Sequence, residues 1–366
     1  MPRVLSRAGP SQLLGLRFED AERLARGVPT GAGFVKQLYA EAFRAARFCP
    51  EDLPIRSASI DAYRELFALE LPVVKRTLEE PSEGPSTVKV VLGLADGLEV
   101  EAVRIPMGPD KTTLCVSSQV GCKMACAFCE TGRMGLVRSL DAHEIVAQLV
   151  VARAVLGWPV KNVVFMGMGE ALDNRSAVFR ALEIFRDRRG LSLSQSNITV
   201  CTAGHVEGLD ELRALGLRRL GVSLSLNAAR DELRAELMPL NRKWPLAEVQ
   251  AALLRYRAFA PRLAFAINYC LLPGLNDSER DIAGIAEFCQ PLGKLMVNVI
   301  PFNPGTAPLT RAPTEEEVSA FLDRIAQKGL PVRRRITRGR SVMAACGQLG
   351  NVELRGARRG IRAVVS

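Results

Sequence analysis

Short apolar runs alternate with segments of helical periodicity along most of this 366-residue chain. From Thr112 onward, apolar runs predict strands at 113–118, 162–169, 197–204, 219–226, 262–271, 295–302 and 332–337. Between them, apolar positions three or four residues apart predict helices at 142–155, 175–187, 246–258, 276–289 and 314–328. Repeated strand–helix units indicate parallel strands joined by crossover helices. The pattern therefore predicts an α/β fold, a partial (β/α)6 barrel over residues 112–338, with its chemistry at the carboxyl ends of the strands.

The segments on either side of this barrel have a different character. Residues 1–80 are predicted to form a small N-terminal helical accessory domain, with helical periodicity at 33–48 and 59–67. Residues 81–111 are predicted as a linker and a β-hairpin extension that turns at Asp96-Gly97. Residues 339–366 form a C-terminal segment after the last strand.

Composition narrows the class of protein. Hydrophobic residues make up 48% and charged residues 24%, which excludes disordered and fibrous classes. No apolar run approaches the roughly 20 residues of a membrane-spanning helix, and the N-terminus carries no secretory signal pattern. We therefore expect a soluble, cytoplasmic protein, a monomer with no membrane partner. The nine cysteines are an odd number, which in such a chain favours metal or redox chemistry over a disulfide scaffold.

Positive charge is concentrated at the C-terminal end. The chain has 49 basic and 39 acidic residues. From Pro331 onward there is one acidic residue, Glu353, against nine arginines: 333, 334, 335, 338, 340, 355, 358, 359 and 362. Such a basic tail favours a polyanionic partner such as RNA, because guanidinium groups match phosphate geometry. A solvated surface with no partner explains the same composition.

The most specific motif is a cysteine triplet, Cys122, Cys126 and Cys129, spaced C-x3-C-x2-C directly after the first barrel strand. Three thiolates at this spacing can ligate three irons of a 4Fe-4S cubane and leave the fourth iron open. A structural zinc ion usually takes four protein ligands, and the nearest further candidate, His143, lies 14 residues on. Zinc binding and a chance grouping remain the alternatives.

Together with the barrel, this triplet resembles the radical S-adenosylmethionine (SAM) superfamily. In that superfamily SAM chelates the open iron through its amino and carboxylate groups and is reductively cleaved to a 5′-deoxyadenosyl radical. Further motifs closely resemble the RlmN/Cfr family of RNA adenine methyltransferases over about residues 89–352: Cys115-Val-Ser-Ser-Gln-Val-Gly-Cys122, Phe165-Met-Gly-Met-Gly-Glu170, Ile300-Pro-Phe-Asn-Pro304 and Ala344-Ala-Cys346-Gly-Gln-Leu349.

The resemblance implies a set of cofactor contacts on a radical-SAM barrel. Cys122, Cys126 and Cys129 correspond to the cluster ligands. The SAM contacts correspond to Gly169, Glu170, Cys201, Ser225, Leu226, Asn227 and Asn303. At two of these the chain departs from the family, which generally has Ser at the position of Cys201 and His at that of Asn227. Taken without the resemblance, strand-end packing explains the same residues.

The resemblance also implies a mechanism that uses two SAM molecules per turnover. Cys346 corresponds to the cysteine that is methylated by the first SAM. The radical from the second SAM removes a hydrogen from that methyl, and the methylene radical attacks an adenine carbon, which is too poor a nucleophile for direct methyl transfer. Cys115 corresponds to the cysteine that then forms a transient disulfide with Cys346, and Glu101 to the proton acceptor. Without the resemblance, Glu101 is expected to be an outward-facing strand residue, and Cys346 a small buried one.

The expected function is therefore methylation of adenine carbon 2 or carbon 8 in RNA. The expected substrate is 23S rRNA, and tRNA is the second candidate substrate. The expected electron donor is a flavodoxin or a ferredoxin. Two alternatives compete with it. A radical SAM enzyme with a non-RNA substrate would have no use for Cys115, Cys346 and the basic tail. An RNA-binding protein with a structural cluster would not explain a cluster site with only three cysteines.

Overall fold

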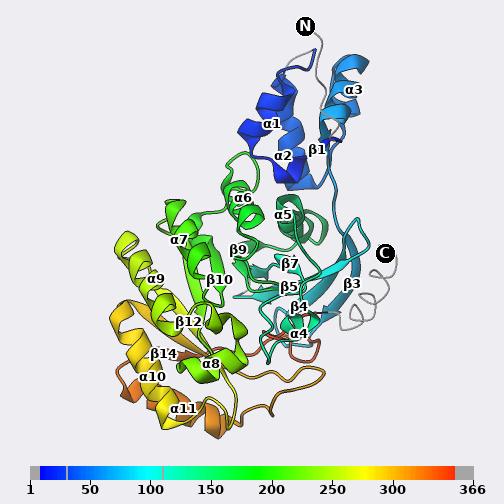
Figure 1. Cartoon of the computed structure of the whole chain (residues 1–366). Helices are drawn as coiled ribbons and strands as arrows, with labels where there is room; N and C mark the ends of the chain where they lie inside the picture. Colours follow the sequence, from blue (N-terminus) through cyan, green and yellow to red (C-terminus); the bar gives the residue numbers. More distant parts are fainter. Residues whose placement is uncertain (1–8, 30–31, 109–110, 351–366) are drawn as a thin grey trace, which may run out of the picture.

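The computed structural model describes residues 9–29, 32–108 and 111–350, and its centre is a ten-stranded sheet (Figure 1). In spatial order the strands are β14 (Val332–Arg334), β13 (Leu295–Pro301), β12 (Phe265–Leu271), β11 (Gly221–Ser225), β10 (Ile198–Thr202), β9 (Val160–Phe165), β6 (Thr112–Cys115), β5 (Glu99–Pro106), β4 (Val88–Gly93) and β3 (Val73–Glu79). Neighbours from β14 to β6 are parallel, and neighbours from β6 to β3 are antiparallel. The α/β partial barrel is confirmed, and the sheet stays open because β14 and β3 are its edges.

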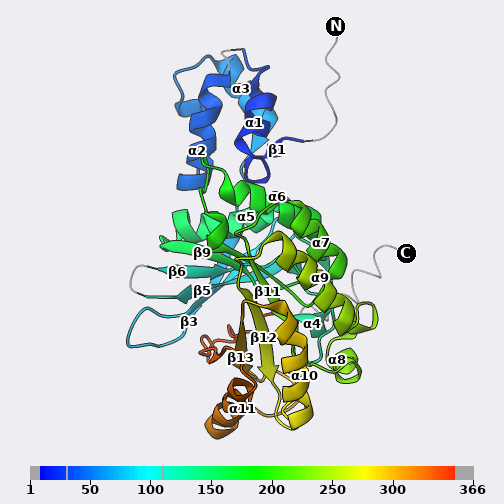
Figure 2. The ribbon, with the colours of Figure 1, turned by 90° about the vertical axis from the view of Figure 1, so that its left-hand side faces the viewer.

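Helices connect the parallel strands and lie against the outside of the sheet (Figures 1 and 2). They are α5 (Ala142–Val150), α6 (Arg175–Arg186), α7 (Val206–Ala214), α8 (Asp231–Leu237), α9 (Leu246–Phe259), α10 (Glu279–Cys289) and α11 (Glu315–Gln327). The sequence pattern does not predict α7 and α8, because helices of nine and seven residues are too short for a clear periodicity. No described helix combines the length and the apolar character that a bilayer-spanning segment needs.

The core lies between the parallel strands and these helices. Val163, Val200, Leu224, Ile267 and Val297, on five successive strands, are fully buried. Strands that bury both faces have near-continuous apolar sequences, which is why their positions could be predicted.

The extension before the barrel has three strands rather than the predicted two. β4 and β5 pair as a hairpin around Asp96-Gly97, as the sequence predicts. β3 (Val73–Glu79) adds to the outer side of β4, although the sequence pattern assigns this range to the helical domain. The prediction was wrong there because most side chains of this edge strand are exposed, so its sequence carries no apolar alternation.

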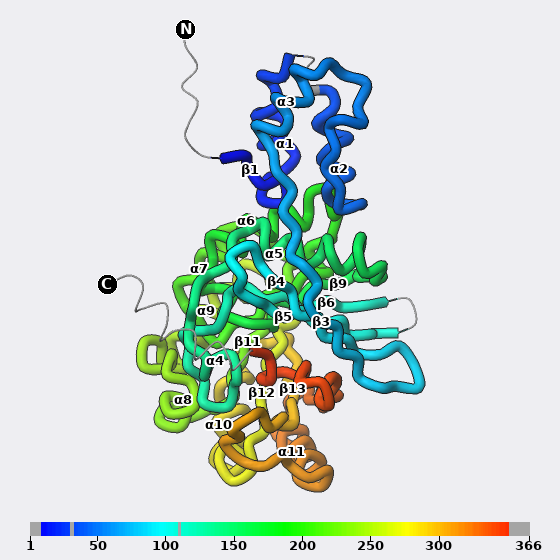
Figure 3. The backbone as a smooth tube through the Cα atoms, turned by 90° about the vertical axis from the view of Figure 1, so that its right-hand side faces the viewer, coloured from blue at the N-terminus to red at the C-terminus, as the bar shows by residue number. Residues whose placement is uncertain are grey.

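The N-terminal helices form a separate lobe above α5 and α6 (Figures 1 and 2). The lobe contains α1 (Phe18–Ala25), α2 (Val35–Ala45) and α3 (Ser57–Leu66), and β1 (Ser11–Gln12) pairs with β2 (Phe67–Ala68). Asp20 accepts a hydrogen bond of 2.5 Å from Arg180 of α6, and Asp187 accepts one of 2.7 Å from the Phe18 backbone N–H. Figure 3 shows the chain leaving the lobe as one extended segment that runs down to β3.

Candidate active site

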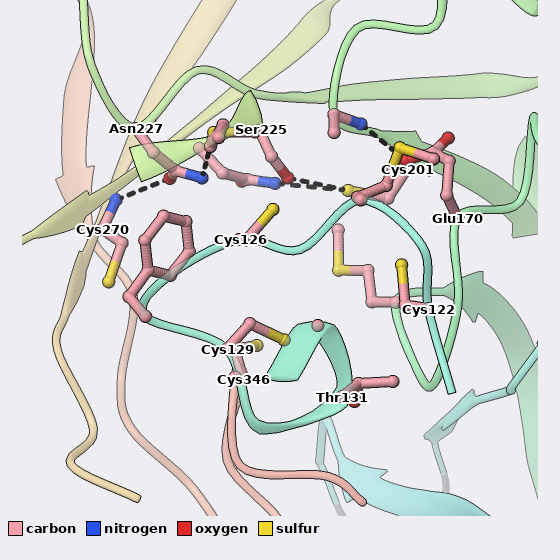
Figure 4. A pocket seen from close by; sticks show the side chains of 18 of the residues that line it. Cys122, Cys126, Cys129, Thr131, Glu170, Cys201, Ser225, Asn227, Cys270 and Cys346 are labelled. Carbon is pink, nitrogen blue, oxygen red and sulfur yellow. Dashed lines mark hydrogen bonds between the residues drawn. The ribbon is translucent and has the colours of Figure 1, made fainter. Parts of the chain in front are cut away.

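A cavity with an empty volume of about 1000 Å³, including the space at its open mouth, lies at the carboxyl ends of the parallel strands. The carboxyl ends of the strands are where barrel enzymes place their chemistry. It is lined by the cysteine triplet, by strand-end residues including Gly169, Glu170, Cys201, Ser225 and Asn227, and by Cys346 (Figure 4).

The cysteine triplet lies on the loop between β7 (Gln119–Val120), which pairs with β8 (Arg138–Ser139), and the short helix α4 (Glu130–Met134). Burial raises the pKa of all three thiols. The pKa of Cys122 rises to about 12, that of Cys126 rises well above its usual value, and that of Cys129 also rises. The thiols therefore stay protonated unless a metal displaces the proton.

The arrangement of these sulfurs fits a cluster. Within the described residues, no three His, Cys, Asp or Glu side chains stand close enough together to hold one metal ion. A cubane makes a different demand, since each cysteine ligates its own iron. His143, the fourth ligand that zinc would need, lies on α5 beside Gly15 and does not line the cavity.

Gly169 and Glu170 follow the end of β9. Gly169 has φ +100°, and a Cβ there would lie 2.6 Å from the Cβ of Gln119, so only glycine fits. The buried Glu170 carboxylate accepts hydrogen bonds from the backbone N–H of Ala203 (2.8 Å) and of Leu172 (3.2 Å). Burial nevertheless dominates and raises the pKa of Glu170 to about 7. A carboxylate at this edge of the cavity can accept further hydrogen bonds from a ligand's amino group.

Cys201, Ser225 and Asn227 lie at the ends of the next two strands. The Cys201 sulfur lies 3.5 Å from the Ser225 hydroxyl oxygen, and burial raises the pKa of this thiol. Asn227 has a left-handed backbone, φ +56°, and its Oδ1 accepts a hydrogen bond of 2.9 Å from the Cys270 N–H. Asn227 thus has its acceptor engaged, and within the described residues its Nδ2 donates to the weak acceptor Met238 Sδ at 3.4 Å and to no stronger one.

Two predicted SAM contacts do not line the cavity. The Leu226 side chain is fully buried in the core, and its N–H donates to the Asn268 carbonyl at 2.9 Å. Asn303 is buried just after the cavity-lining Phe302, and its Oδ1 has no hydrogen-bond partner within the described part of the chain. A buried acceptor without a partner beside the cavity is suited to a ligand donor such as the amino group of an adenine.

Cys346 is exposed, and its segment folds back against the cysteine triplet, since the Glu130 N–H donates to the Gly347 carbonyl at 2.8 Å. This contradicts the expectation that a lone cysteine here is buried. Cys115 is buried at the end of β6. Burial, followed by the electrostatic effect of Cys346, raises the pKa of the Cys115 thiol to about 12, and the positive charge of Arg335 opposes that rise. All nine cysteines are free thiols in this structure.

Glu101 is not the outward-facing strand residue that the pattern alone suggests. Only 7% of it is exposed, and it forms an ion pair with Lys89 at 3.2 Å. Its Oε2 accepts a hydrogen bond of 2.9 Å from the N–H of Gly350, four residues after Cys346. The error arose because strand alternation predicts which side of the sheet a residue faces, but not what covers that side.

The arginine run on β14 does not form the open row of cations that the sequence suggests. Arg333 donates to Asn298 at 2.6 Å, and Arg334 forms an ion pair with Glu315. Arg335 lines the cavity instead, where the charge of Cys346 raises its pKa. The remaining tail arginines 355, 358, 359 and 362 lie outside the described residues.

Sequence reasoning also missed polar residues inside the barrel. Asn298 donates to Asn268 at 3.0 Å, and Asn268 donates to Ser223 at 2.8 Å, so a row of polar side chains crosses β13, β12 and β11, and its middle member, Asn268, lines the cavity. Polar residues in strands buried on both faces are the signal that could have identified this row.

Comparisons with known proteins agree with this geometry. The model of the radical SAM superfamily matches residues 116–286. A relative from Protochlamydia amoebophila, "Probable dual-specificity RNA methyltransferase RlmN 1", is 36% identical and the match covers 89% of this chain and 90% of that protein. A "Dual-specificity RNA methyltransferase RlmN" from Rhodospirillum rubrum is 37% identical, with 94% and 82% covered. The chain belongs to the RlmN/Cfr family of radical SAM enzymes.

A solved structure supports the same assignment. The crystal structure of a radical SAM methyltransferase from Sphaerobacter thermophilus superposes with a TM-score of 0.85 at 33% identity, covering 93% of this chain and 99% of that one. Membership of the RlmN/Cfr family implies a 4Fe-4S cluster and SAM. The cavity therefore has the place and the donor groups that these cofactors need.

Proposed function

We propose that this enzyme methylates an adenine carbon in RNA by radical SAM chemistry, with Cys346 as the methyl carrier. One observation carries the proposal: Cys346 lines the same cavity as the cysteine triplet and the strand-end residues Gly169 and Glu170. A cysteine without a role in catalysis has no reason to lie exposed at a cofactor site. RNA as the substrate class follows the names of the relatives and the basic C-terminal segment.

The proposed cofactor contacts are residues that line the cavity, together with Asn303. Cys122, Cys126 and Cys129 would hold the cluster. Glu170, Cys201, Ser225, Asn227 and the amide of Asn303 would contact SAM, with Gly169 leaving room for it. When bound, the cluster supplies the electron that cleaves SAM. Each turnover would use two SAM molecules, one for the methyl group and one for the radical.

The remaining steps belong to side chains of this protein. Cys346 accepts a methyl group on sulfur and then loses one hydrogen atom from it to the SAM-derived radical, so that the carbon can bond to adenine. Glu101 takes the proton that leaves the adenine carbon, and the unpaired electron of the adduct would return to the cluster, which would thus supply and recover one electron per turnover. The Cys115 sulfur then attacks the Cys346 sulfur, which breaks the bond between Cys346 and the new methylene and leaves a disulfide. The electron pair of the broken bond stays with the carbon, which is protonated to a methyl group.

The finer assignments follow the family. The proposed substrates are 23S rRNA and tRNA, with carbon 2 or carbon 8 as the target, and the reductant is a flavodoxin or a ferredoxin. The helical lobe would help to bind RNA, and residues 112–338 would carry the chemistry.

Mass spectrometry of nucleosides from cells with and without the gene tests the proposal. One methyladenosine, modified on carbon, should disappear from rRNA or tRNA when the gene is deleted. It should return with the wild-type gene and not with a Cys346→Ala gene. Unchanged nucleosides in every RNA fraction would contradict it.

A further inference from the structure

Lys89 is a buried cation on an otherwise apolar strand, Val-Lys-Val-Val-Leu-Gly of β4. Only 5% of the residue is exposed. Its Nζ forms an ion pair with Glu101 Oε1 at 3.2 Å and donates a hydrogen bond of 3.0 Å to the Met343 carbonyl. A buried ammonium group is costly unless its partners compensate for lost hydration, so this geometry is specific.

The strand register explains why these groups meet. Lys89 pairs with Val103 of β5, and Val103 pairs with Cys115 of β6. Glu101 is two residues from Val103 and therefore lies on the same face of the sheet. Lys89, Glu101 and Cys115 thus share one face.

The segment that carries Cys346 is held against this face at two points. Met343, three residues before Cys346, is bound by Lys89, and Gly350, four residues after it, donates to Glu101 Oε2 at 2.9 Å. The Lys89–Glu101 pair thereby connects the two anchors. Because one carboxylate receives both the ammonium group and the Gly350 N–H, a change in its charge acts directly on the Gly350 anchor and, through Lys89, on the Met343 anchor.

We propose that Lys89 is a positioning residue that holds Glu101 and the segment 343–350 as one unit, and that proton transfer to Glu101 loosens this unit. The proposal rests on the proposed function, in which Glu101 takes a proton from the adenine carbon. That proton neutralises the carboxylate, so the ion pair with Lys89 is lost and the Gly350 hydrogen bond is no longer charge-assisted. The Cys346 segment is then held less tightly at its two ends, although the Glu130–Gly347 hydrogen bond remains, at the point in the reaction where its sulfur has to meet Cys115.

Hydrogen–deuterium exchange of the full-length protein without substrate tests the structural part. Lys89→Met and Glu101→Gln should both speed exchange in the peptide covering 343–350, by about tenfold, because each removes a charge-assisted contact. Glu101→Gln keeps an acceptor for Gly350 and imitates the protonated acid, so it stays informative where Lys89→Met fails to fold. The control Lys75→Met, an exposed lysine on β3, should leave this peptide unchanged. Wild-type exchange in Glu101→Gln would overturn the proposal.

The covalent protein–RNA adduct provides the second measurement. If Lys89 keeps Glu101 able to accept the proton, Lys89→Met should accumulate a protein–RNA adduct, seen on a denaturing gel as a band that RNase removes. Lys89→Arg keeps the positive charge and should therefore restore turnover. Equal loss of turnover in both variants without adduct would make Lys89 merely structural and overturn the proposal. A wild-type protein that methylates no RNA would refute the proposed function instead, and the exchange experiment would still decide whether Lys89 holds the segment.

Discussion

Cys115 and Cys346 lie in opposite environments. Cys346 is exposed and lines the cavity, where we propose that it receives a methyl group and meets a substrate base. Cys115 is buried at the end of β6 and does not line the cavity, and its raised pKa keeps the thiol protonated and unreactive at neutral pH. The order that the family resemblance implies agrees with this difference, because the exposed thiol would act first and the buried one after it.

Substituting each cysteine should therefore give a different product. Cys346→Ala is expected to bind the cluster and SAM but to transfer no methyl group to RNA. Cys115→Ala should carry out the early steps and stop as a covalent adduct between the Cys346 sulfur and RNA. Denaturing gels of both variants expressed in cells, with and without RNase, provide the measurement. If neither cysteine took part in catalysis, neither variant would show a shifted band, and only the buried Cys115→Ala would lose about 1–3 kcal/mol of stability.

Glu170 should make SAM binding depend on pH. Burial raises its pKa to about 7, and the ionised carboxylate is the form that accepts hydrogen bonds from an amino group. Its ionised fraction rises from about one tenth at pH 6 to about nine tenths at pH 8. We therefore expect the affinity of anaerobic wild-type protein for SAM to rise between pH 6 and pH 8 by about tenfold more than that of Glu170→Gln. Equilibrium binding at several pH values measures this. Parallel pH profiles for the two proteins would exclude this role.

At the residue scale, sequence alone could predict the groups whose chemistry depends on spacing. The triplet Cys122, Cys126 and Cys129 and the strand ends at Glu170 and Ser225 all line one cavity. It could not predict which side chains the C-terminal segment covers, so Glu101 was expected to face outward and Arg335 to face solvent. Both errors concern contacts that the C-terminal segment makes after it folds back: Gly350 with Glu101, 249 residues earlier in the chain, and Cys346 with Arg335.

At the scale of elements, apolar patterning predicted the central parallel strands well because most of their residues are buried or half-buried. It failed at β3, an edge strand whose position is determined by backbone pairing with β4 rather than by side-chain burial. Apolar patterns in a sequence indicate which residues are buried, so an exposed edge strand has no alternation of apolar and polar residues from which it could be predicted.

The contact between the helical lobe and the barrel predicts a pH dependence of stability. Asp20 of α1 accepts hydrogen bonds from Arg17 and from Arg180 of α6, and these lower its pKa to about 2. An unfolded Asp titrates near 4, so this stabilisation is complete above about pH 4 and is lost as the pH falls towards 2.

Arg180→Gln should therefore lower the free energy of unfolding by about 1–2 kcal/mol at pH 7 and by much less near pH 2.5. Urea denaturation at the two pH values measures this, with the exposed Arg188→Gln as control. An equal loss at both pH values would mean that Arg180 acts through packing rather than through the charge of Asp20.

At the scale of the whole molecule, the cavity opens beside a segment that carries exposed cations. Arg338 and Arg340 are exposed, whereas Arg334 is paired with Glu315. If the exposed pair binds RNA phosphates, the double change to Gln should reduce the slope of log affinity against log salt by about 2, and Arg334→Gln should leave it nearly unchanged. RNA-binding titrations at several salt concentrations measure the slope. Equal slopes for wild type and the double variant would show that Arg338 and Arg340 do not contact RNA.

The central claim is that the methyl group reaches RNA through Cys346 and loses a hydrogen on the way. Protein whose Cys346 carries a CD₃ group can be reacted once with RNA and unlabelled SAM, and the methyladenosine can be weighed by mass spectrometry. The account predicts a product that retains two deuterium atoms, with the third found in 5′-deoxyadenosine. A product with three deuterium atoms, or with none, would contradict it.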